Sequence, residues 1–410
     1  MRVARLGHLP AVLALCGALA LGGCGKGAAE RPAAHGGPTK AVAAVAAGGA
    51  VSVVTRNTTR LGGADVATDA TAVARAVYPG LTSATRPQAV VLVDERDWPA
   101  ALAASELASA PLNAPIIYSE GDVLPAVSLE ALEALDPQGA SALGGVQVLR
   151  IGTSAPVPAR FVTHSLPAAA AQELAGSVEQ LLASSAGAAS HDVIVVPTNV
   201  PLALQMPAAG LAAESGSPIL FVAPGNLAAA TTKTLVGLHH PSIYLLDSAR
   251  VAVSTLHALR HLGTVSEIPS SAPGEAVSPS ASAIAAARFT DGQFGWGVKE
   301  PGHGLVFASA FRPLDAPAAA LLSATADYGP LLLLEGPRQI SAGLASYLGD
   351  IQPAYADSYV YRPAVGVYNH GWLIGDEKAI SEVVQGELDS LLEISPSKQT
   401  PAEPSTTQGE

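Results

Sequence analysis

Cysteine is almost absent from this chain of 410 residues, which contains only Cys16 and Cys24. If the segment around Cys16 is removed during secretion, no disulfide can form within the chain. Catalysis by a free thiol and zinc sites built from several thiolates are excluded as well. The folded protein must therefore take its stability from packed hydrophobic cores.

Charged and aromatic side chains are also scarce, at 14% and 4% of the residues. The formal net charge is −12. This charge excludes a nucleic-acid partner, because phosphate binding needs a basic face. Long apolar segments are interrupted by 40 glycines and 32 prolines, which predicts a folded α/β protein rather than a disordered or coiled-coil one. The length predicts about two to four compact units.

The usual catalytic signatures are missing from the sequence. There is no Gly-x-Ser-x-Gly elbow, no Walker phosphate loop and no His-Glu-x-x-His motif. His257 and His261 are four residues apart on an expected helix, but without a positioned carboxylate such a pair is more typical of coincidence. The cluster YNHGWLIGDE at 368–377 coincides with the strand and turn that are expected to close the third module, which favours a structural role. We therefore predict a protein that is not an enzyme and that needs no cofactor or metal.

The N-terminus reads MRVARLGHLPAVLALCGALALGGC, with two arginines ahead of a short apolar stretch. These are the parts of a secretory signal, and the stretch is too short to span a bilayer permanently. The LGGC sequence resembles a bacterial lipobox, which implies removal of residues 1–23 and attachment of lipid, palmitate included, to Cys24. The alternative is a plain secretory signal with an incidental cysteine. Two or more acyl chains would hold the protein on the outer face of the cytoplasmic membrane, facing the cell wall.

Three segments have the composition of connections rather than of folded structure. Residues 24–50 are rich in Gly, Ala and Pro and are predicted to form a flexible tether. Residues 395–410 are polar and Pro-rich, as in a disordered tail. Residues 266–282, which contain SEIPSSAPGEAVSPSAS, are predicted to be an internal linker.

The remaining chain contains the same series of landmarks three times. Each series has an apolar strand, a helix of small residues, a second strand opened by proline, a second helix, and a third strand that ends in a turn. The first strands are AVVLV, DVIVV and GLVFA, beginning at residues 89, 192 and 304. We predict three tandem modules at 51–160, 161–265 and 283–394.

Strands that are apolar along their whole length, alternating with helices, predict parallel sheets covered on both faces. The connections are expected to be right-handed. Each module is therefore predicted to be a small three-layer αβα sandwich with a parallel sheet. Three similar modules predict packing as a pseudo-threefold trimer, although separate modules in a row remain an alternative.

At these residues the chain resembles the cell-wall-binding repeat 2 family of Gram-positive envelope proteins. The resemblance covers residues 55–393 and rests on RLGGAD at 60–65, the proline-opened aliphatic strands and the turn after each third strand. The motif RLGGAD is clear only in the first module, and the Asp-Ala pair of the family survives only as Asp315-Ala316. The chain is thus a divergent member by this likeness.

The resemblance implies binding of an anionic cell-wall glycopolymer, with the proline-opened strands needed for it. Carried over residue by residue, the implied polymer-binding positions are Pro115, Ile116, Ile117, Tyr118, Pro218, Ile219, Leu220, Phe221, Pro330, Leu331, Leu332 and Leu333. Such a proline and triplet is usually the entry to a buried strand, whose role is burial worth roughly 1.5–3 kcal/mol per side chain.

An anionic ligand also needs cations, and ligands of parallel sheets lie beyond the carboxyl ends of the strands. Six arginines in or beside loops at strand or module ends are possible anion contacts: Arg60, Arg96, Arg150, Arg312, Arg338 and Arg362. For any one of them, a solvated surface arginine is the more frequent case. The acidic chain makes any such binding local.

The sequence therefore predicts a non-catalytic, lipid-anchored envelope protein whose modules bind an anionic wall polymer. One alternative is a solute-binding lipoprotein of a transporter, which predicts two lobes and a hinge. Another is a scaffold that has lost polymer binding and meets an envelope protein partner.

Overall fold

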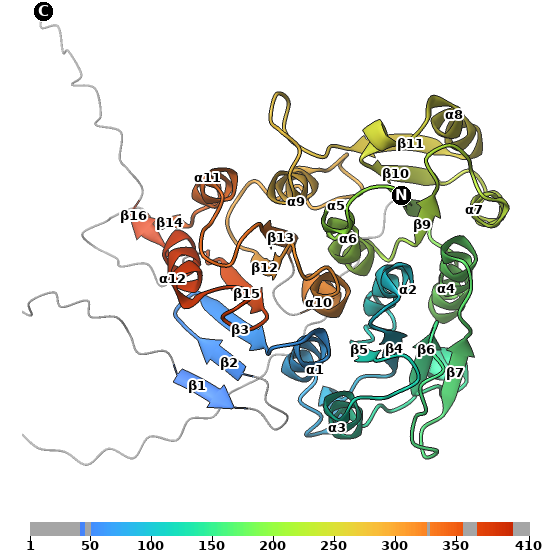
Figure 1. Ribbon diagram of the computed structural model, residues 1–410, viewed down its shortest axis with the longest axis horizontal. Helices are drawn as coiled ribbons and strands as arrows, with labels where there is room; N and C mark the ends of the chain where they lie inside the picture. The colour runs from blue at the N-terminus through green and yellow to red at the C-terminus, as the bar shows by residue number, and fades with distance from the viewer. Residues whose placement is uncertain (1–41, 46–50, 326–328, 356–366, 397–410) are drawn as a thin grey trace, which may run out of the picture. The chain divides into compact units, whose positions relative to one another are not determined.

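The computed structural model describes residues 42–45, 51–325, 329–355 and 367–396. These residues contain three separate sheets, each with four parallel strands (Figure 1). The predicted signal peptide, the predicted lipid-accepting residue Cys24, and Arg362 lie outside the described residues. The α/β fold with parallel-sheet modules is confirmed.

Sheet 1 has the strand order β5-β4-β6-β7, with all neighbours parallel. Its strands are β4 (Val90–Asp94), β5 (Ile116–Ser119), β6 (Val148–Ile151) and β7 (Thr163–Leu166). The associated helices are α2 (Trp98–Ala104), its 3-10 extension η2 (Ser105–Ala108) and α3 (Ala126–Leu135), and the 3-10 turns η1 (Ser83–Thr85) and η3 (Ser141–Leu143) lie in the loops.

Sheet 2 repeats the pattern in the order β11-β10-β8-β9, again wholly parallel. Its strands are β8 (Asp192–Pro197), β9 (Ile219–Val222), β10 (Ser242–Leu246) and β11 (Thr264–Ile268). Its helices are α5 (Leu202–Gln205), α6 (Pro207–Ser215), α7 (Ala229–Gly237) and α8 (Val253–Leu262), with η4 (Ser248–Arg250) before α8.

Sheet 3 has the parallel strands β13-β12-β15-β3, and β2 and β1 extend it in antiparallel fashion. Its strands are β1 (Val42–Val45), β2 (Val51–Val54), β3 (Thr58–Gly62), β12 (Gly304–Ser309), β13 (Leu331–Leu334) and β15 (His370–Ile374). Its helices are α10 (Asp315–Ala324), α11 (Ala342–Asp350) and α12 (Glu382–Leu391), and a small pair joins β14 (Ala354–Tyr355) to β16 (Ser395–Pro396).

The repeated prolines open the second strand of each module, as predicted. A proline is tolerated at the start of a strand because the ladder does not need its missing N–H. Its carbonyl is still used: the carbonyl oxygens of Pro115, Pro218 and Pro330 accept hydrogen bonds of 2.9–3.0 Å from the first strand of the same module. The pattern therefore marks where β5, β9 and β13 join their sheets.

Each sheet takes its fourth strand from the segment that opens another module. The strand β7 completes sheet 1 and leads into helix α4 (Ala171–Ala186), while β11 completes sheet 2 and precedes α9 (Pro279–Arg288). The strand β3 completes sheet 3 by pairing with β15 and leads into α1 (Val66–Val77), so a strand near the start of the described chain lies in the sheet of the third module (Figure 1). Strand exchange thus links all three modules in a closed cycle.

The helices that follow the first strands, α2 with η2, α6 and α10, pack against one another in pairs. Small residues allow the close approach: a Cβ added at Gly210 of α6 would lie 3.0 Å from the Ser323 hydroxyl of α10. Contact between equivalent helices is what a threefold arrangement requires, and the symmetry itself stays a prediction.

The segments predicted as connections contain regular structure at their ends. Within 266–282, the residues up to Ile268 belong to β11, and Ile268 is buried. Helix α9 begins at Pro279, with Ser278 as its N-cap. Residues 42–45 of the predicted tether form β1, and residues 395–396 of the predicted tail form β16. Within the described residues, none of the helices has the length and apolar character needed to cross a membrane.

Candidate functional site

The twelve residues of the proline-opened strands lie inside the modules. All are buried, and none of the nine triplet side chains is more than 3% exposed. The triplets belong to the central layer of each sandwich, where they contact the flanking helices rather than solvent. A part in polymer binding would therefore act through the stability of the sheets, and it stays a prediction.

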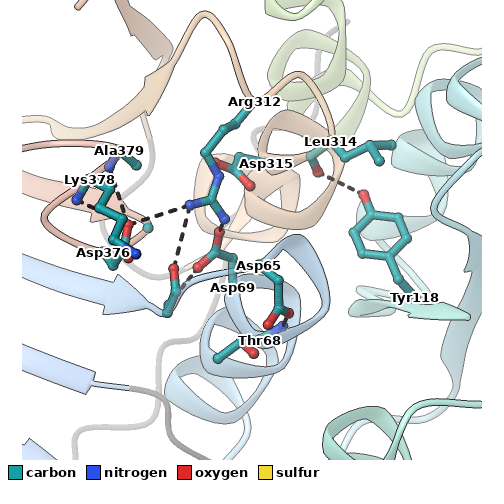
Figure 2. A network of polar contacts seen from close by, with 12 residues as sticks. Asp65, Thr68, Asp69, Tyr118, Arg312, Leu314, Asp315, Asp376, Lys378 and Ala379 are labelled. Carbon is teal, nitrogen blue, oxygen red and sulfur yellow. Dashed lines mark hydrogen bonds and ion pairs between the residues drawn. The ribbon is translucent and has the colours of Figure 1, made fainter. Parts of the chain in front are cut away.

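Tyr118 joins two modules through a hydrogen bond of its side chain. Its ring is fully buried, and its hydroxyl donates a hydrogen bond of 2.7 Å to the carbonyl oxygen of Leu314, just before α10 (Figure 2). Burial raises the pKa of this phenol well above its usual value. The neutral hydroxyl is thus a fixed donor between sheet 1 and the third module.

Arg60 is buried within sheet 3 instead of lying in a loop. Its Nε donates to Gln385 of α12 at 3.1 Å, and its Nη1 donates to the carbonyl oxygen of Gly375 at 3.0 Å. Burial lowers the pKa of Arg60, and the nearby Glu377 and Asp376 oppose this effect. The geometry gives Arg60 a structural role between β3 and α12.

Arg96 follows β4 in sheet 1, and Arg150 lies within β6 of the same sheet. The exposed Arg96 forms an ion pair with Asp94, at 3.2 Å, just beyond the carboxyl end of β4. Glu95, Glu120 and Asp122 contribute further negative charge around this arginine. Arg150 instead donates from Nε to the Ser165 hydroxyl, at 2.8 Å, across β6 and β7.

Arg312 is the centre of a polar network at the carboxyl end of sheet 3 (Figure 2). It lies in the loop after β12 and forms ion pairs with Asp69 of α1, with Asp315 of α10 at 3.1 Å, and with Asp376 after β15 at 3.8 Å. Only 18% of the Arg312 side chain is exposed, and Asp69 and Asp315 are fully buried. One guanidinium therefore faces three carboxyl groups.

Burial controls the protonation of this network. It raises the pKa of Asp69 to about 6, although Arg312 and the Gly63 amide act in the opposite direction. Burial, with repulsion by Asp69, raises the pKa of Asp315 well above its usual value. Two buried carboxyl groups that share one cation cannot both ionise easily. Asp315 therefore holds its proton more tightly than an ordinary carboxyl group.

The RLGGAD motif builds this junction between β3 and α1. Asp65 is the N-cap of α1 and accepts from the Thr68 amide at 2.8 Å. Gly62 has a φ of +132°, and a Cβ there would lie 2.2 Å from the Asp69 carboxylate oxygen. The Gly63 amide donates to the same carboxylate at 2.6 Å. The cap by Asp65, the close approach at Gly62 and the hydrogen bond from Gly63 give a physical reason for RLGGAD to occur at the junction between β3 and α1.

The last predicted arginine that the structure describes, Arg338, is exposed in the loop after β13. Phe311, next to Arg312 in the chain, is 74% exposed, and Lys378, two residues after Asp376, is exposed as well. The six predicted arginines are therefore not brought together in one anion-binding groove: one is buried, two are neutralised by carboxylates, and Arg362 lies outside the described residues.

Sequence reasoning missed the residues that join the modules. Asp69 pairs with Arg312, the Trp98 indole donates to Gln205 at 2.9 Å, and Tyr244 donates to Asp291 at 2.8 Å. The only signal in the sequence was the isolated acidic residue in an otherwise small and apolar helix, as at Asp69 within VATDATAVARAV.

Solved structures that share this fold include Cwp8 and Cwp6. Cwp8 from Clostridium difficile matches with a TM-score of 0.59 at 16% identity, over 82% of this chain and 52% of that chain. Cwp6 from Clostridium difficile matches with a TM-score of 0.60 at 15% identity, over 87% of this chain and 51% of that chain. The chain spans about half the length of each. No family model and no curated protein matches the sequence.

Proposed function

We propose that this chain is a non-catalytic, lipid-anchored protein of the cell envelope that binds an anionic cell-wall glycopolymer. The observation that carries the proposal is the fold: three parallel-sheet modules, linked by exchanged strands, in the arrangement shared with Cwp8 and Cwp6. The signal-like N-terminus and LGGC sequence support anchoring through Cys24.

The polymer would contact exposed residues, since the triplets are buried. Phe311 directly precedes Arg312 and Lys378 follows Asp376 by two residues, so they provide an apolar ring and a cation at the carboxyl end of sheet 3. Ligands of parallel sheets bind at this end. An exposed ring can cover the apolar face of a sugar, and the cation can meet one anionic group. Because the chain is acidic overall, we expect it to bind a polyanion through a few local contacts rather than over a broad surface.

A sedimentation assay tests polymer binding. The chain without residues 1–24 is mixed with purified walls, either intact or stripped of their anionic polymers. Retention should require the polymers, and a Phe311→Ser, Lys378→Glu variant should bind about tenfold more weakly. The matched control is Val253→Ser, Lys233→Glu, which changes an exposed apolar residue and an exposed cation in the second module. Equal retention on both wall preparations would overturn the proposal.

Lipid attachment has a separate test. A cell that expresses the full chain is grown with a clickable palmitate analogue, and the protein is isolated from the membrane fraction. Labelling should occur in the wild-type chain and be lost in Cys24→Ala, whereas Cys16→Ala should still be labelled. Release of an unlabelled chain into the medium would instead indicate a plain secretory signal.

A second candidate is a scaffold that binds an envelope protein rather than a polymer. It is favoured by the carboxylates that surround Arg312 and Arg96, because they weaken attraction for a polyanion. The solute-binding alternative predicts two lobes and a hinge, and the three parallel sheets do not have that organisation. Absence of wall retention together with a partner captured by crosslinking would favour the scaffold.

A further inference from the structure

The helix α8, on the outside of sheet 2, carries a pair of neighbouring imidazoles. His257 and His261 are four residues apart, which places them one above the other on the helix. Their ring centroids are 4.4 Å apart and their planes are inclined by 81°. Both residues are exposed, so neither ring is needed to fill the core.

This spacing fits chelation of one metal ion. Two histidines at positions i and i+4 of a helix reach the same ion, and imidazole suits Zn²⁺, Ni²⁺ and Cu²⁺. Nitrogen ligands about 2.0–2.1 Å from a tetrahedral Zn²⁺ lie about 3.3 Å from each other. The rings are already adjacent, and because they are exposed, small side-chain rotations can aim one nitrogen of each at a shared ion.

The local charge also favours a cation. His261 lies in the last turn of α8, which ends at Leu262, and the free carbonyl groups at a helix C-terminus attract positive charge. The intervening Arg260 is drawn toward β11 by Glu267, with 3.6 Å between Arg260 Nη2 and Glu267 Oε1. Glu267 also accepts a hydrogen bond of 2.6 Å from Ser248.

We propose that His257 and His261 form a two-ligand surface site for a borderline divalent transition metal, Zn²⁺, Ni²⁺ or Cu²⁺. The described residues contain no group of three or more metal-ligating side chains, so water or an external ligand fills the remaining positions. The site is independent of the proposed polymer contact near Phe311, which lies in another module.

Metal titration of the untagged mature chain tests this site. Zn²⁺ or Ni²⁺ alone is added while heat release is followed by calorimetry, and one ion per chain is expected. His257→Ala and His261→Ala should each weaken binding by at least about tenfold. The double variant should lose less binding free energy than the sum of the two single losses, because one remaining histidine coordinates the ion without chelating it. This lack of additivity distinguishes a shared ion from two separate sites.

His191→Ala is the matched control, because it removes another exposed histidine of the same module and should leave the affinity unchanged. Far-ultraviolet circular dichroism of each variant checks that α8 and the rest of the fold are retained. Binding of wild-type strength in both His257→Ala and His261→Ala would overturn the proposal, as would the absence of binding by the wild-type chain. A loss equal to that of His191→Ala would also overturn it.

Discussion

Asp69 forms a buried ion pair with Arg312, 243 positions further along the chain. The pair joins the first helix of the described fold to the loop after β12, directly where β3 completes sheet 3. It is therefore part of the junction that connects the beginning of the chain to the third module. Its energetic weight follows from burial, since both partners have little access to water.

Removal of Arg312 should destabilise the fold strongly. Arg312→Ala leaves Asp69 and Asp315 buried without their cation, and breaking a buried pair in this way costs about 3–5 kcal/mol. The comparison is Arg96→Ala, which removes an exposed ion pair and should change the free energy of unfolding much less. Urea unfolding followed by circular dichroism measures both changes. Equal effects of the two substitutions would contradict a special role for Arg312.

The Asp69 carboxyl should make the fold less stable as the pH rises from about 4 to about 6. Its pKa is about 6 in the native chain and 3.8 as an ordinary carboxyl, so the native state holds the proton more tightly. The stability that this provides is present at low pH and is lost as the pH rises through 6. The loss is at most about 3 kcal/mol.

The Asp69→Asn variant isolates this effect, because its amide cannot ionise while its oxygen can still accept from Gly63. The difference in unfolding free energy between wild type and variant is measured in urea from pH 4 to pH 7. We expect the wild type to lose stability relative to the variant over this range. A relative gain would mean that Arg312 lowers the pKa of Asp69 more than burial raises it.

The modules were predictable from sequence because their signals are local. Continuous apolar runs, Ala-rich helices and the entering proline at Pro115 each specify structure within a few residues. The exchanged strands β3, β7 and β11 lack a continuous apolar run that would indicate a buried strand in the sequence. Of the four residues of β7, three are exposed, and β3 buries Thr58, Thr59 and Arg60.

Arg60 shows why the site was harder to predict than the fold. Its partners, Gln385 and Gly375, are more than 300 positions away, so nothing near it in the sequence indicates a buried arginine. Asp69 and Arg312 are 243 positions apart, so nothing near either residue in the sequence indicates their pairing. Local patterns therefore identified the sheets, whereas the contacts between modules depend on pairings that only the folded chain brings together.

Tyr118 should contribute to stability in two separable ways. Tyr118→Phe removes only the hydrogen bond to Leu314 and should cost about 0.5–1.5 kcal/mol. Tyr118→Ala also leaves a large cavity in the core and should cost about 3–5 kcal/mol. If the triplets act on polymer binding only through the fold, Tyr118→Phe should keep full retention on walls. Lost retention in a Tyr118→Phe variant with native stability would instead assign Tyr118 a direct role.

Gly62 should be nearly irreplaceable at the junction of β3 and α1. In Gly62→Ala the new Cβ would lie 2.2 Å from the Asp69 carboxylate and 2.8 Å from the Gly375 amide, at a φ of +132°. Gly144→Ala is the control, because it also has a positive φ but meets nothing within 4 Å, and it should cost only about 1–2 kcal/mol. Since the Gly62 clash adds to the backbone strain, Gly62→Ala should cost clearly more stability than Gly144→Ala.

In Gly62→Ala, hydrogen exchange should be faster at Gly371–Ile374 of β15, the partner of β3, while β4 and β8 stay protected. Equal costs for the two substitutions would show that β3 moves to accept the methyl group, and the strand that joins the chain's beginning to its third module would be looser than its contacts indicate.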